Sequence, residues 1–564
     1  MSEPLRQYET IDDALWPDRE APATIRFKGN KFAWVDFDGF DLSGCDMSGA
    51  VFAYCSFTSA RLDGCDLTEA SFINCSLDGV SLSNANLRES KIIECRVSGL
   101  AIGGTEFEGA ALVNLDLTDA TLGGARLAAS KIIGCNLTGR DLRSATLSGT
   151  VIARCALKDV IFPDRLEDVH LVECDAGGLD LSGREIVGAV FAQSDLTAAI
   201  FDRATLRKCQ LTSVKIGGAS AVEATFDACA FSAEDLGLGA LLIEARSVVG
   251  SQFIGGDAAG AVLSGVDLTS CALIQVNLAG ATLSDATLKD TTVVESVLAD
   301  VKLTSCRAER LIISSSDASR IDLARSHLES TGFSQTDLTG ATMSGTRFRS
   351  AFLDAPPFPS ITLDKTDFAN TYLAEADFRD KDLRGCRIVQ SIVNKSDLTG
   401  ANLSGVELTQ SQFMESDLTG VDFTGARANY TQFGKSIIKD ANFGGADARW
   451  ANFGGSTLEM VGFKNANLAQ AMLTEMTAKG LDFTDADVRE AHLTRSDISD
   501  AQVIDANLKG AVMHDTQLTR TDLTAAKLGG IVGTDDELKE AERFRPPAYP
   551  MEYVRRTRGD SSDE

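Results

Sequence analysis

Thirteen cysteines are the residues of this sequence with the most obvious chemical potential, because thiolates bind metals and carry out redox reactions. Metal sites built from cysteine use short CxxC-like pairs, and the sequence contains none. The cysteines near the N-terminus recur instead at steps of ten or twenty residues. They are Cys45, Cys55, Cys65, Cys75, Cys95, Cys135, Cys155, Cys174, Cys209, Cys229, Cys271, Cys306 and Cys386.

Histidine is the other side chain that could support catalysis, as a general base or a metal ligand. His170, His327, His492 and His514 are far apart in the sequence, and none joins a nucleophile and a carboxylate in a recognisable constellation. The glycines recur at a five-residue spacing and form no phosphate-binding loop. We therefore expect no enzyme activity, no cofactor and no metal site.

A five-residue period organises the chain that carries these residues. Every fifth residue from Phe27 to Phe162 is apolar, and so is every fifth residue from Phe253 to Leu528. A shorter series in another phase runs from Leu171 to Leu241. Helices repeat every 3.6 residues and strands every two, so neither alone explains this period. It predicts a chain that turns a corner after every five residues.

Each five-residue unit has the same layout, as in CDLTE at 65–69 and SDLTG at 396–400. Residues two apart in an extended chain point the same way, so the small first residue and the large third residue face inward. The second residue, often Asp, Asn or Ser, faces outward, and the last two form the corner, where turn residues are favoured. All thirteen cysteines occupy the small inward position, which predicts inert thiols that pack like a slightly larger alanine.

These units resemble the pentapeptide repeat family, whose consensus is A(D/N)LXX. The resemblance covers about 500 residues, and the third series holds its phase far longer than chance allows. It implies an all-β fold, a right-handed quadrilateral β-helix with short helical caps and four units in each coil. Residues twenty apart would then stack on one wall of the prism. The resemblance also implies a bacterial origin.

The phase of the repeat divides the chain into five parts. Residues 1–24 are expected to cap the N-terminal coil, and residues 25–162 form the first β-helix segment. Residues 163–250 form the second segment, with a phase break at each end, and residues 251–530 form the third. A capping helix that follows Thr534 and a disordered tail are expected in residues 531–564, because TDDE is typical of a helix start. The stretch around 232–247 also suits a short helix.

Two walls of the third segment concentrate charge. One carries an acidic ladder, interrupted by Pro357, whose members are Asp317, Asp337, Asp377, Asp397 and Asp417. Another alternates in sign through Arg347, Asp367, Arg387, Glu407, Arg427 and Asp447. Opposite charges on neighbouring strands attract modestly, so we interpret the alternating wall as a structural ladder.

A third wall replaces the polar outward residue by Phe352, Tyr372 and Ile392 in successive coils. Contiguous exposed apolar side chains usually mark an interaction site, so this column is the candidate protein-binding site. The prolines at 356, 357 and 359 lie beside it. A proline-rich loop folded over the column is the competing interpretation, in which the three residues are local core.

The net charge of −28 narrows the choice of partner. Strong acidity disfavours direct binding to nucleic acids or anionic membranes. No apolar run is long enough to span a bilayer, and the N-terminus lacks the features of a signal peptide. We expect a cytoplasmic protein, or one exported by a route that needs no signal peptide.

The expected function is therefore that of a non-catalytic acidic rod, a protein-interaction scaffold or a component of a larger assembly such as secretion or injection machinery. A homodimer formed through an end cap is a further expectation. The alternative is a DNA mimic that modulates DNA gyrase, another topoisomerase or another DNA-binding protein, as the resemblance to gyrase-protecting pentapeptide proteins implies. The acidic ladder would then be the functional surface.

Overall fold

The computed structural model describes residues 26–232 and 237–543. The expected N-terminal cap and the C-terminal tail lie outside these residues. The chain divides into two compact units, Met1–Arg347 (unit 1) and Phe348–Glu564 (unit 2). Each unit is built from coils of a right-handed quadrilateral β-helix, in which parallel pairing joins residues of successive coils. The fold predicted from the repeat is confirmed.

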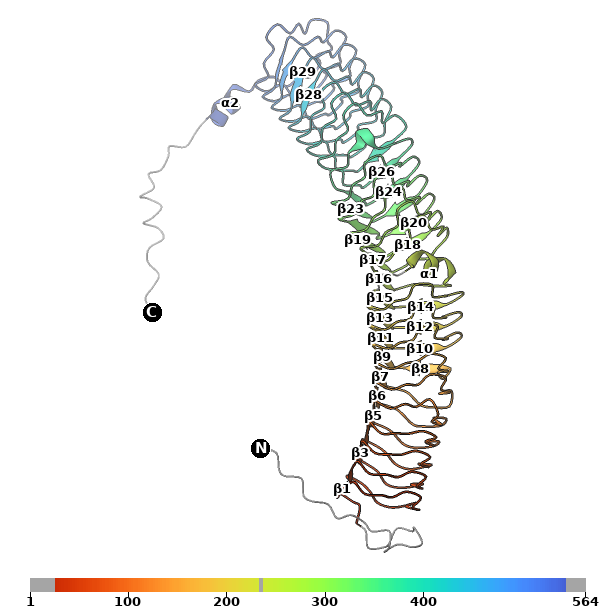
Figure 1. Ribbon diagram of the computed structural model, residues 1–564. Helices are drawn as coiled ribbons and strands as arrows, with labels where there is room; N and C mark the ends of the chain where they lie inside the picture. Colours follow the sequence, from red (N-terminus) through yellow and green to blue (C-terminus); the bar gives the residue numbers. More distant parts are fainter. Residues whose placement is uncertain (1–25, 233–236, 544–564) are drawn as a thin grey trace, which may run out of the picture. The chain divides into compact units, whose positions relative to one another are not determined.

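The first face of unit 1 is a stack of three-residue strands (Figure 1). Phe32 pairs with Phe52, and Phe52 with Phe72, so the register advances by twenty residues in each coil. The strands are β1 (Lys31–Ala33), β2 (Val51–Ala53), β3 (Ser71–Ile73), β4 (Lys91–Ile93), β5 (Ala111–Val113), β6 (Lys131–Ile133), β7 (Val151–Ala153), β9 (His170–Val172), β11 (Val190–Ala192), β13 (Gln210–Thr212), β15 (Ala230–Ser232), β16 (Gln252–Ile254), β17 (Ala272–Ile274), β19 (Thr292–Val294), β21 (Ile312–Ser314) and β23 (Gly332–Ser334).

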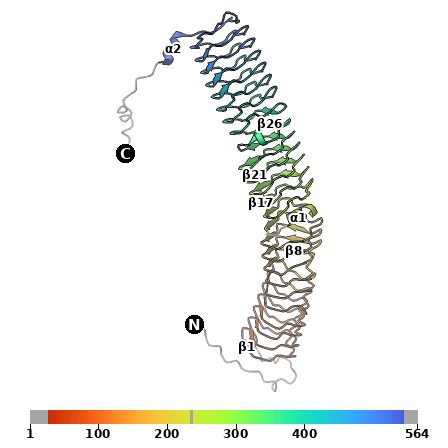
Figure 2. The same ribbon diagram turned by 45° about the horizontal axis from the view of Figure 1, so that its top comes forward.

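The fourth face of unit 1 carries the other strands of that unit (Figures 1 and 2). They are β8 (Arg165–Glu167), β10 (Glu185–Val187), β12 (Thr205–Arg207), β14 (Thr225–Asp227), β18 (Thr287–Lys289), β20 (Arg307–Glu309) and β22 (His327–Glu329). The second and third faces pair through single bridges, such as Asp36 with Ser56 and Asp41 with Arg61. Strand β24 (Arg347–Arg349) spans the boundary between the units.

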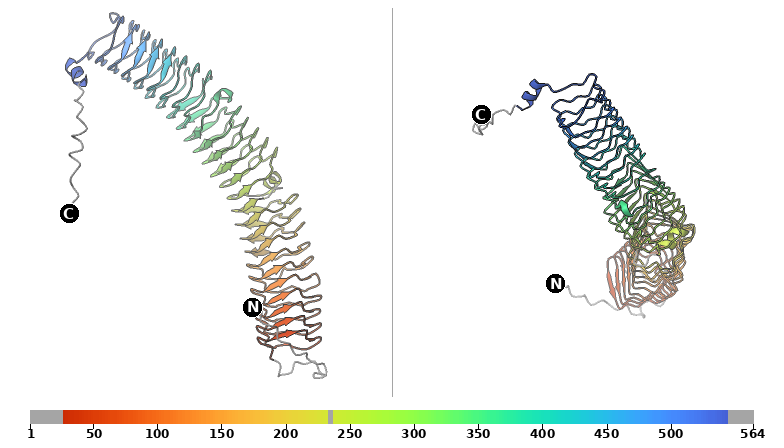
Figure 3. Two further views of the ribbon diagram at one scale, coloured as in Figure 1. Left: turned by 60° about the vertical axis from the view of Figure 1, so that its left-hand side comes forward. Right: turned by 90° about the horizontal axis from the view of Figure 1, so that it is seen from above.

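Unit 2 repeats this plan with fewer strands and more single bridges. Figure 3 shows the strands of its blue part as short arrows stacked one above another. The elements are β25 (Phe352–Leu353), η2 (Phe358–Ser360), β26 (Asp367–Ala369), β27 (Arg387–Val389), β28 (Ile437–Lys439), β29 (Thr457–Glu459), β30 (Thr477–Lys479), β31 (Asp497–Ser499) and α2 (Asp536–Arg543).

The interior of each unit consists of the inward residues that the repeat predicts. Phe52, Leu67 and Leu398 have no measurable exposure, because the first and third residues of each unit fill the prism. The fifth residue of a unit takes a left-handed backbone conformation, with φ of 70° at Gly39. Glycine adopts this conformation without a steric penalty, which explains the Thr-Gly and Ser-Gly corners.

The two phase breaks change the register of the first face. Val151 of β7 pairs with His170 of β9, nineteen residues on, so the first break removes one residue from the coil. Ala230 of β15 pairs with Gln252 of β16, and helix α1 (Leu238–Glu244) takes up the two extra residues. The helix starts later than Ser232, which ends β15. Leu241 therefore lies in a helix and does not belong to the wall series.

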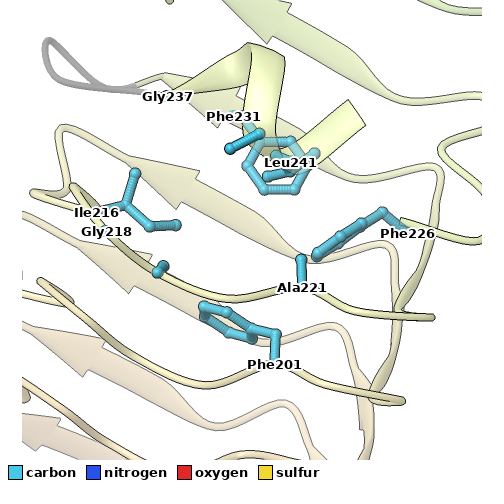
Figure 4. A pocket seen from close by; sticks show the side chains of 10 residues that line it. Phe201, Ile216, Gly218, Ala221, Phe226, Phe231, Gly237 and Leu241 are labelled. Atoms are coloured by element: carbon cyan, nitrogen blue, oxygen red, sulfur yellow. The ribbon is translucent and has the colours of Figure 1, made fainter. Parts of the chain in front are cut away.

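Helix α1 covers a small apolar hollow in this wider coil (Figure 4). Phe201, Phe226 and Phe231 line it from the solenoid, and Leu241 lines it from the helix. The lining side chains are apolar, with no ionisable group among them. The hollow is therefore a packing feature of the insertion and has no groups for catalysis.

The C-terminal helix differs from the expected cap in its contacts. Asp535 Oδ1 accepts the Leu538 N–H at 3.0 Å, so Asp535 and not Thr534 caps α2. Leu538 is 48% exposed, and the contacts to the preceding coils are polar. Asp535 donates its backbone N–H to His514 Nδ1 at 3.1 Å, and Lys539 Nζ lies 2.5 Å from Asp515. In the described part of α2, Leu538 and Ala541 are thus exposed and do not cover the last coil.

Candidate protein-binding surfaces

The cysteines lie inward, as their position in the repeat predicts. All thirteen are free, and all but Cys45 are buried. Burial raises the pKa of the Cys65 thiol to about 12 and the pKa of the Cys306 thiol to about 11. Thiols with a raised pKa are poor nucleophiles at neutral pH. Within residues 26–232 and 237–543, no group of three or more His, Cys, Asp or Glu side chains is arranged to hold a metal ion.

The histidines lie in different local settings, and in unit 2 His492 pairs with Val512, two residues before His514. His170 faces outward on β9, and His327 lies on β22, where its Nε2 is 3.2 Å from Arg347 Nη1. In unit 2, His492 is exposed and His514 is buried against the start of α2. Each histidine thus has its own local structural environment.

The acidic ladder lies outward within each unit. In unit 1, Asp317 pairs with Asp337. In unit 2, Asp377 pairs with Asp397, which pairs with Asp417. Pro357 precedes this second run and Ile437 follows it. The predicted stacking is therefore present within each unit, and in unit 2 the acidic run covers only three successive coils.

Each carboxylate of the ladder accepts a hydrogen bond that stabilises its own corner. Asp397 Oδ1 accepts the backbone N–H of Thr399 at 3.0 Å and the Thr399 hydroxyl at 2.7 Å. The same bond from the N–H two residues on is made to Asp317, Asp337, Asp377 and Asp417. Such Asx turns stabilise a corner with either Asp or Asn. The preference for these residues at the outward position thus has a local cause that does not require a basic partner.

A guanidinium also neutralises part of the ladder. Arg379 Nη2 lies 2.7 Å from Asp377 Oδ2, and Arg379 Nε lies 3.8 Å from Asp397. The hydrogen bond from Arg379 lowers the pKa of Asp377 below its usual range. In unit 1, hydrogen bonds from Thr339 lower the pKa of Asp337 in the same direction. These carboxylates stay ionised, but hydrogen bonds and an ion pair within the protein already stabilise part of their charge.

The wall of alternating charge forms ion pairs in part of its length. Arg387 lies 3.2 Å from Asp367, and Arg427 lies 3.4 Å from Glu407. The backbone of Asp447 bridges to Arg427, but its carboxylate forms an ion pair with Arg449 of its own corner, 2.7 Å away. Exposed pairs of this kind contribute about 0.2–1 kcal/mol each. A structural role therefore suffices to explain this wall.

The column of Phe352, Tyr372 and Ile392 faces solvent in unit 2. Phe352 is 38% exposed and Tyr372 is 42% exposed, and Ile392 is half-buried. The three residues pair in successive coils. The proline stretch turns inward at η2, where Phe358 is buried and stacks on Phe378 with 4.1 Å between ring centroids. The prolines therefore place Phe358 in the core and leave the exposed column uncovered.

The column continues as an uncharged face of unit 2. Paired outward residues follow one another in every coil of this face, and none is Asp, Glu, Lys or Arg. We call this set the neutral face of unit 2. It consists of Phe352, Tyr372, Ile392, Gln412, Gln432, Asn452, Met472, His492, Val512 and Val532.

A pair of aromatic residues at the border of the neutral face escaped the sequence analysis. Tyr430 and Trp450 stack with centroids 4.8 Å apart and planes at 2°, and Arg449 lies 5.5 Å over the Trp450 ring. Both occupy corners, with φ of 59° and 58°, where bulky residues are unfavourable. The corner leads to Gln432, whose Nε2 donates to the Tyr430 carbonyl oxygen at 3.2 Å. Aromatic residues at two corners twenty residues apart were the available signal.

Stacked coils with an apolar interior and outward columns of varied chemistry define a β-solenoid repeat protein. The chain belongs to the pentapeptide repeat family. The family model of pentapeptide repeats matches more than half of the chain, at residues 31–68, 65–99, 177–212, 185–227, 249–285, 261–298, 319–354, 382–420, 416–455, 463–500 and 496–531. No helix in the described residues is long and apolar enough to cross a bilayer.

Solved structures of the same kind resemble parts of the chain. HetL, a pentapeptide repeat protein involved in heterocyst differentiation regulation in the cyanobacterium Nostoc, is 22% identical over 46% of this chain and 90% of its own, with a TM-score of 0.15. QnrB1, a plasmid-mediated fluoroquinolone resistance protein, is 16% identical over 43% of this chain and 99% of its own, with a TM-score of 0.18. A search of curated proteins gave no match.

Proposed function

We propose that this protein is a non-catalytic interaction scaffold that binds a protein partner through the neutral face of unit 2. The observation that carries the proposal is the exposed stack of Phe352 and Tyr372 in a chain with a net charge of −28. Large aromatic side chains are the usual anchors of protein interfaces. A larger assembly, such as secretion or injection machinery, is the setting we propose for this scaffold.

The composition of the neutral face supports this role. Interface centres are depleted in charged residues and enriched in aromatic residues and methionine. Met472, in the same column as Tyr372, is 47% exposed, and Trp450 at the border is 38% exposed. Gln432 and Asn452 hydrogen-bond to each other at 3.0 Å and keep free capacity for a partner. Apolar anchors and neutral polar groups therefore occur together along one surface.

Site-specific crosslinking tests the proposal. A photoreactive phenylalanine at Gln412, between Ile392 and Gln432, should crosslink a protein partner in cells. The control position for the photoreactive residue is Asn442, an outward residue that pairs with Asp422 on another face of the same unit. Crosslinking from Gln412 that is lost in Phe352→Ser/Tyr372→Ser supports the neutral face. Equal crosslinking from Asn442, or none from either position, contradicts it.

The alternative function is DNA mimicry of a gyrase-like enzyme through the acidic ladder. The run of Asp377, Asp397 and Asp417 favours it, but each carboxylate accepts a corner N–H and Arg379 partly neutralises the run. A supercoiling assay with DNA gyrase decides the matter. Inhibition or protection by the unmutated protein, reduced when the three aspartates become Asn, would favour mimicry. An unaffected enzyme would exclude it for gyrase.

We also propose that the protein works in the cytoplasm. Its thirteen cysteines are free and inward-facing, and reducing compartments keep thiols in that state. Fractionation with a fluorescent fusion would check this location.

A further inference from the structure

The first face of unit 1 lacks acidic residues altogether in its strands. The first and third residues of each strand point outward, because the middle residue is inward. Across β1–β7, β9, β11, β13, β15–β17, β19, β21 and β23, these outward positions contain no Asp or Glu. Lys31, Lys91, Lys131 and His170 are their only ionisable residues. This is notable in a chain with 81 acidic residues.

The strand conformation does not cause this absence. The fourth face of unit 1 has strands of the same length with outward charges of both signs. Arg165 on β8 lies 3.5 Å from Glu185 on β10, and Lys289 on β18 lies 3.6 Å from Glu309 on β20. Charged residues are thus compatible with this backbone, and the first face is neutral for another reason.

Aliphatic side chains occupy much of the first face. Ile73, Ile93, Val113 and Ile133 are direct neighbours on successive strands, and all four are half-buried. Further along the face, Ile312 is 47% exposed. The strip from Ile73 to Ile133 is continuous and aliphatic, and an exposed strip of this kind marks a contact surface.

We propose that the first face of unit 1 packs against the same face of a second copy of this chain. Two molecules with a charge of −28 repel each other, and the repulsion is smallest where the touching surfaces carry no acid. The second and third faces carry Asp36, Asp41 and other aspartates along their columns, so they cannot meet in this way. The same surface on both molecules gives a closed two-fold dimer.

The available area is sufficient for a stable dimer. Strands about 4.8 Å apart and three residues wide make a surface of roughly 70 Å by 10 Å. A face-to-face contact would bury about 1,400 Å² in total, within the range of about 1,200–2,000 Å² that specific complexes bury. Flat sheets pack face to face at about 10 Å, with aliphatic side chains between them. The lysine stems can lie along that layer with their ammonium groups at its rim.

The charge pattern favours a second copy over other partners. A basic partner would be drawn to the aspartate-bearing faces, and an acidic partner would be repelled by the net charge of the chain. The dimer should therefore strengthen as salt screens the repulsion between the two bodies. A contact between opposite charges would weaken under the same change.

Sedimentation velocity of the full chain tests this inference. We expect a dimer at about 50 µM, since an interface of this size commonly gives micromolar or tighter affinity. Ile93→Glu/Ile133→Glu should raise the dissociation constant at least about 100-fold, because the dimer would bury four unpaired carboxylates. The control is Val187→Glu, which changes the third, half-buried residue of β10 on the charged fourth face and should leave the dimer intact. Circular dichroism melts establish that both variants fold.

Three results would overturn the inference. The first is a monomer at all concentrations, and the second is a dimer that Ile93→Glu/Ile133→Glu leaves unchanged. The third is a dimer that is lost only in Leu528→Glu/Val532→Glu, which would place the contact at the exposed C-terminal end of the solenoid. The Phe352→Ser/Tyr372→Ser variant should remain dimeric, so failure of the proposed partner site and failure of this dimer are distinguishable.

Discussion

The rings of Phe352 and Tyr372 stack with 5.2 Å between their centroids and 20° between their planes. The two residues are twenty positions apart in the sequence and are paired in successive coils. A solenoid therefore builds one surface from residues at a fixed sequence interval, with the strand spacing setting their distance. Substituting one member of such a column changes a local contact without disturbing distant coils, since each coil contacts only its neighbours.

Replacing both rings by serine should cost little stability. The change Phe352→Ser/Tyr372→Ser removes a stacked pair whose side chains are already more than a third exposed, so we expect a loss of less than about 2 kcal/mol in the free energy of unfolding. The matched change is Phe358→Ser, which removes a fully buried ring and should cost about 3–5 kcal/mol. Chemical denaturation measures both. A double variant as unstable as Phe358→Ser would make the column local core.

The sequence predicted the inward positions better than the outward ones. The five-residue period placed the cysteines and Leu398 inside, because burial of an apolar side chain depends on its position in the unit alone. The neutral first face was not predicted. Ile93 is the fourth residue of its five-residue unit, and this position lies in a turn on some faces and in a strand on others. Likewise, Tyr430 and Trp450 stand at corners where the repeat predicts turn residues. The neutral first face and the stacked aromatic pair depend on which coils are neighbours and on the turn conformation at each corner.

Asp397 should tolerate asparagine better than alanine. Its Oδ1 accepts the Thr399 N–H at 3.0 Å, and asparagine keeps that acceptor while removing the charge. We expect Asp397→Ala to lower the free energy of unfolding by about 1 kcal/mol, the worth of one hydrogen bond. Asp397→Asn should change it by less than half of that. Equal losses in both variants would show that the charge, and not the Asx turn, stabilises the corner.

Stability should fall in acid between about pH 4 and pH 2. Hydrogen bonds from Ser48 and Arg384 lower the pKa of Asp46 and of Asp382 from 3.8 to about 2. A lowered pKa means that the folded state favours the ionised carboxylate, so its contribution is complete above pH 4 and is lost as the pH falls through the folded-state value. Thermal unfolding at pH 5, pH 3 and pH 2 should show a falling melting temperature. A constant melting temperature over this range would contradict the role of these bonds.

Cys45 should be the first cysteine to react with an alkylating reagent in the native protein. It is partly exposed, whereas the other twelve cysteines are buried. Burial raises the pKa of Cys45 as well as that of Cys65, so access to the reagent is what separates them. The reactive species is the thiolate, so both burial and a raised pKa slow the reaction. Mass spectrometry after iodoacetamide treatment at pH 7.5 should find label on Cys45 and, only after denaturation, on the remaining cysteines.

The control is Cys45→Ala, which should abolish native labelling and leave the melting temperature nearly unchanged, because alanine already fills the same inward position at Ala50 and Ala60. Rapid native labelling of Cys174 or Cys306 would show that the coils open locally, and the inward assignment of those thiols would then be wrong.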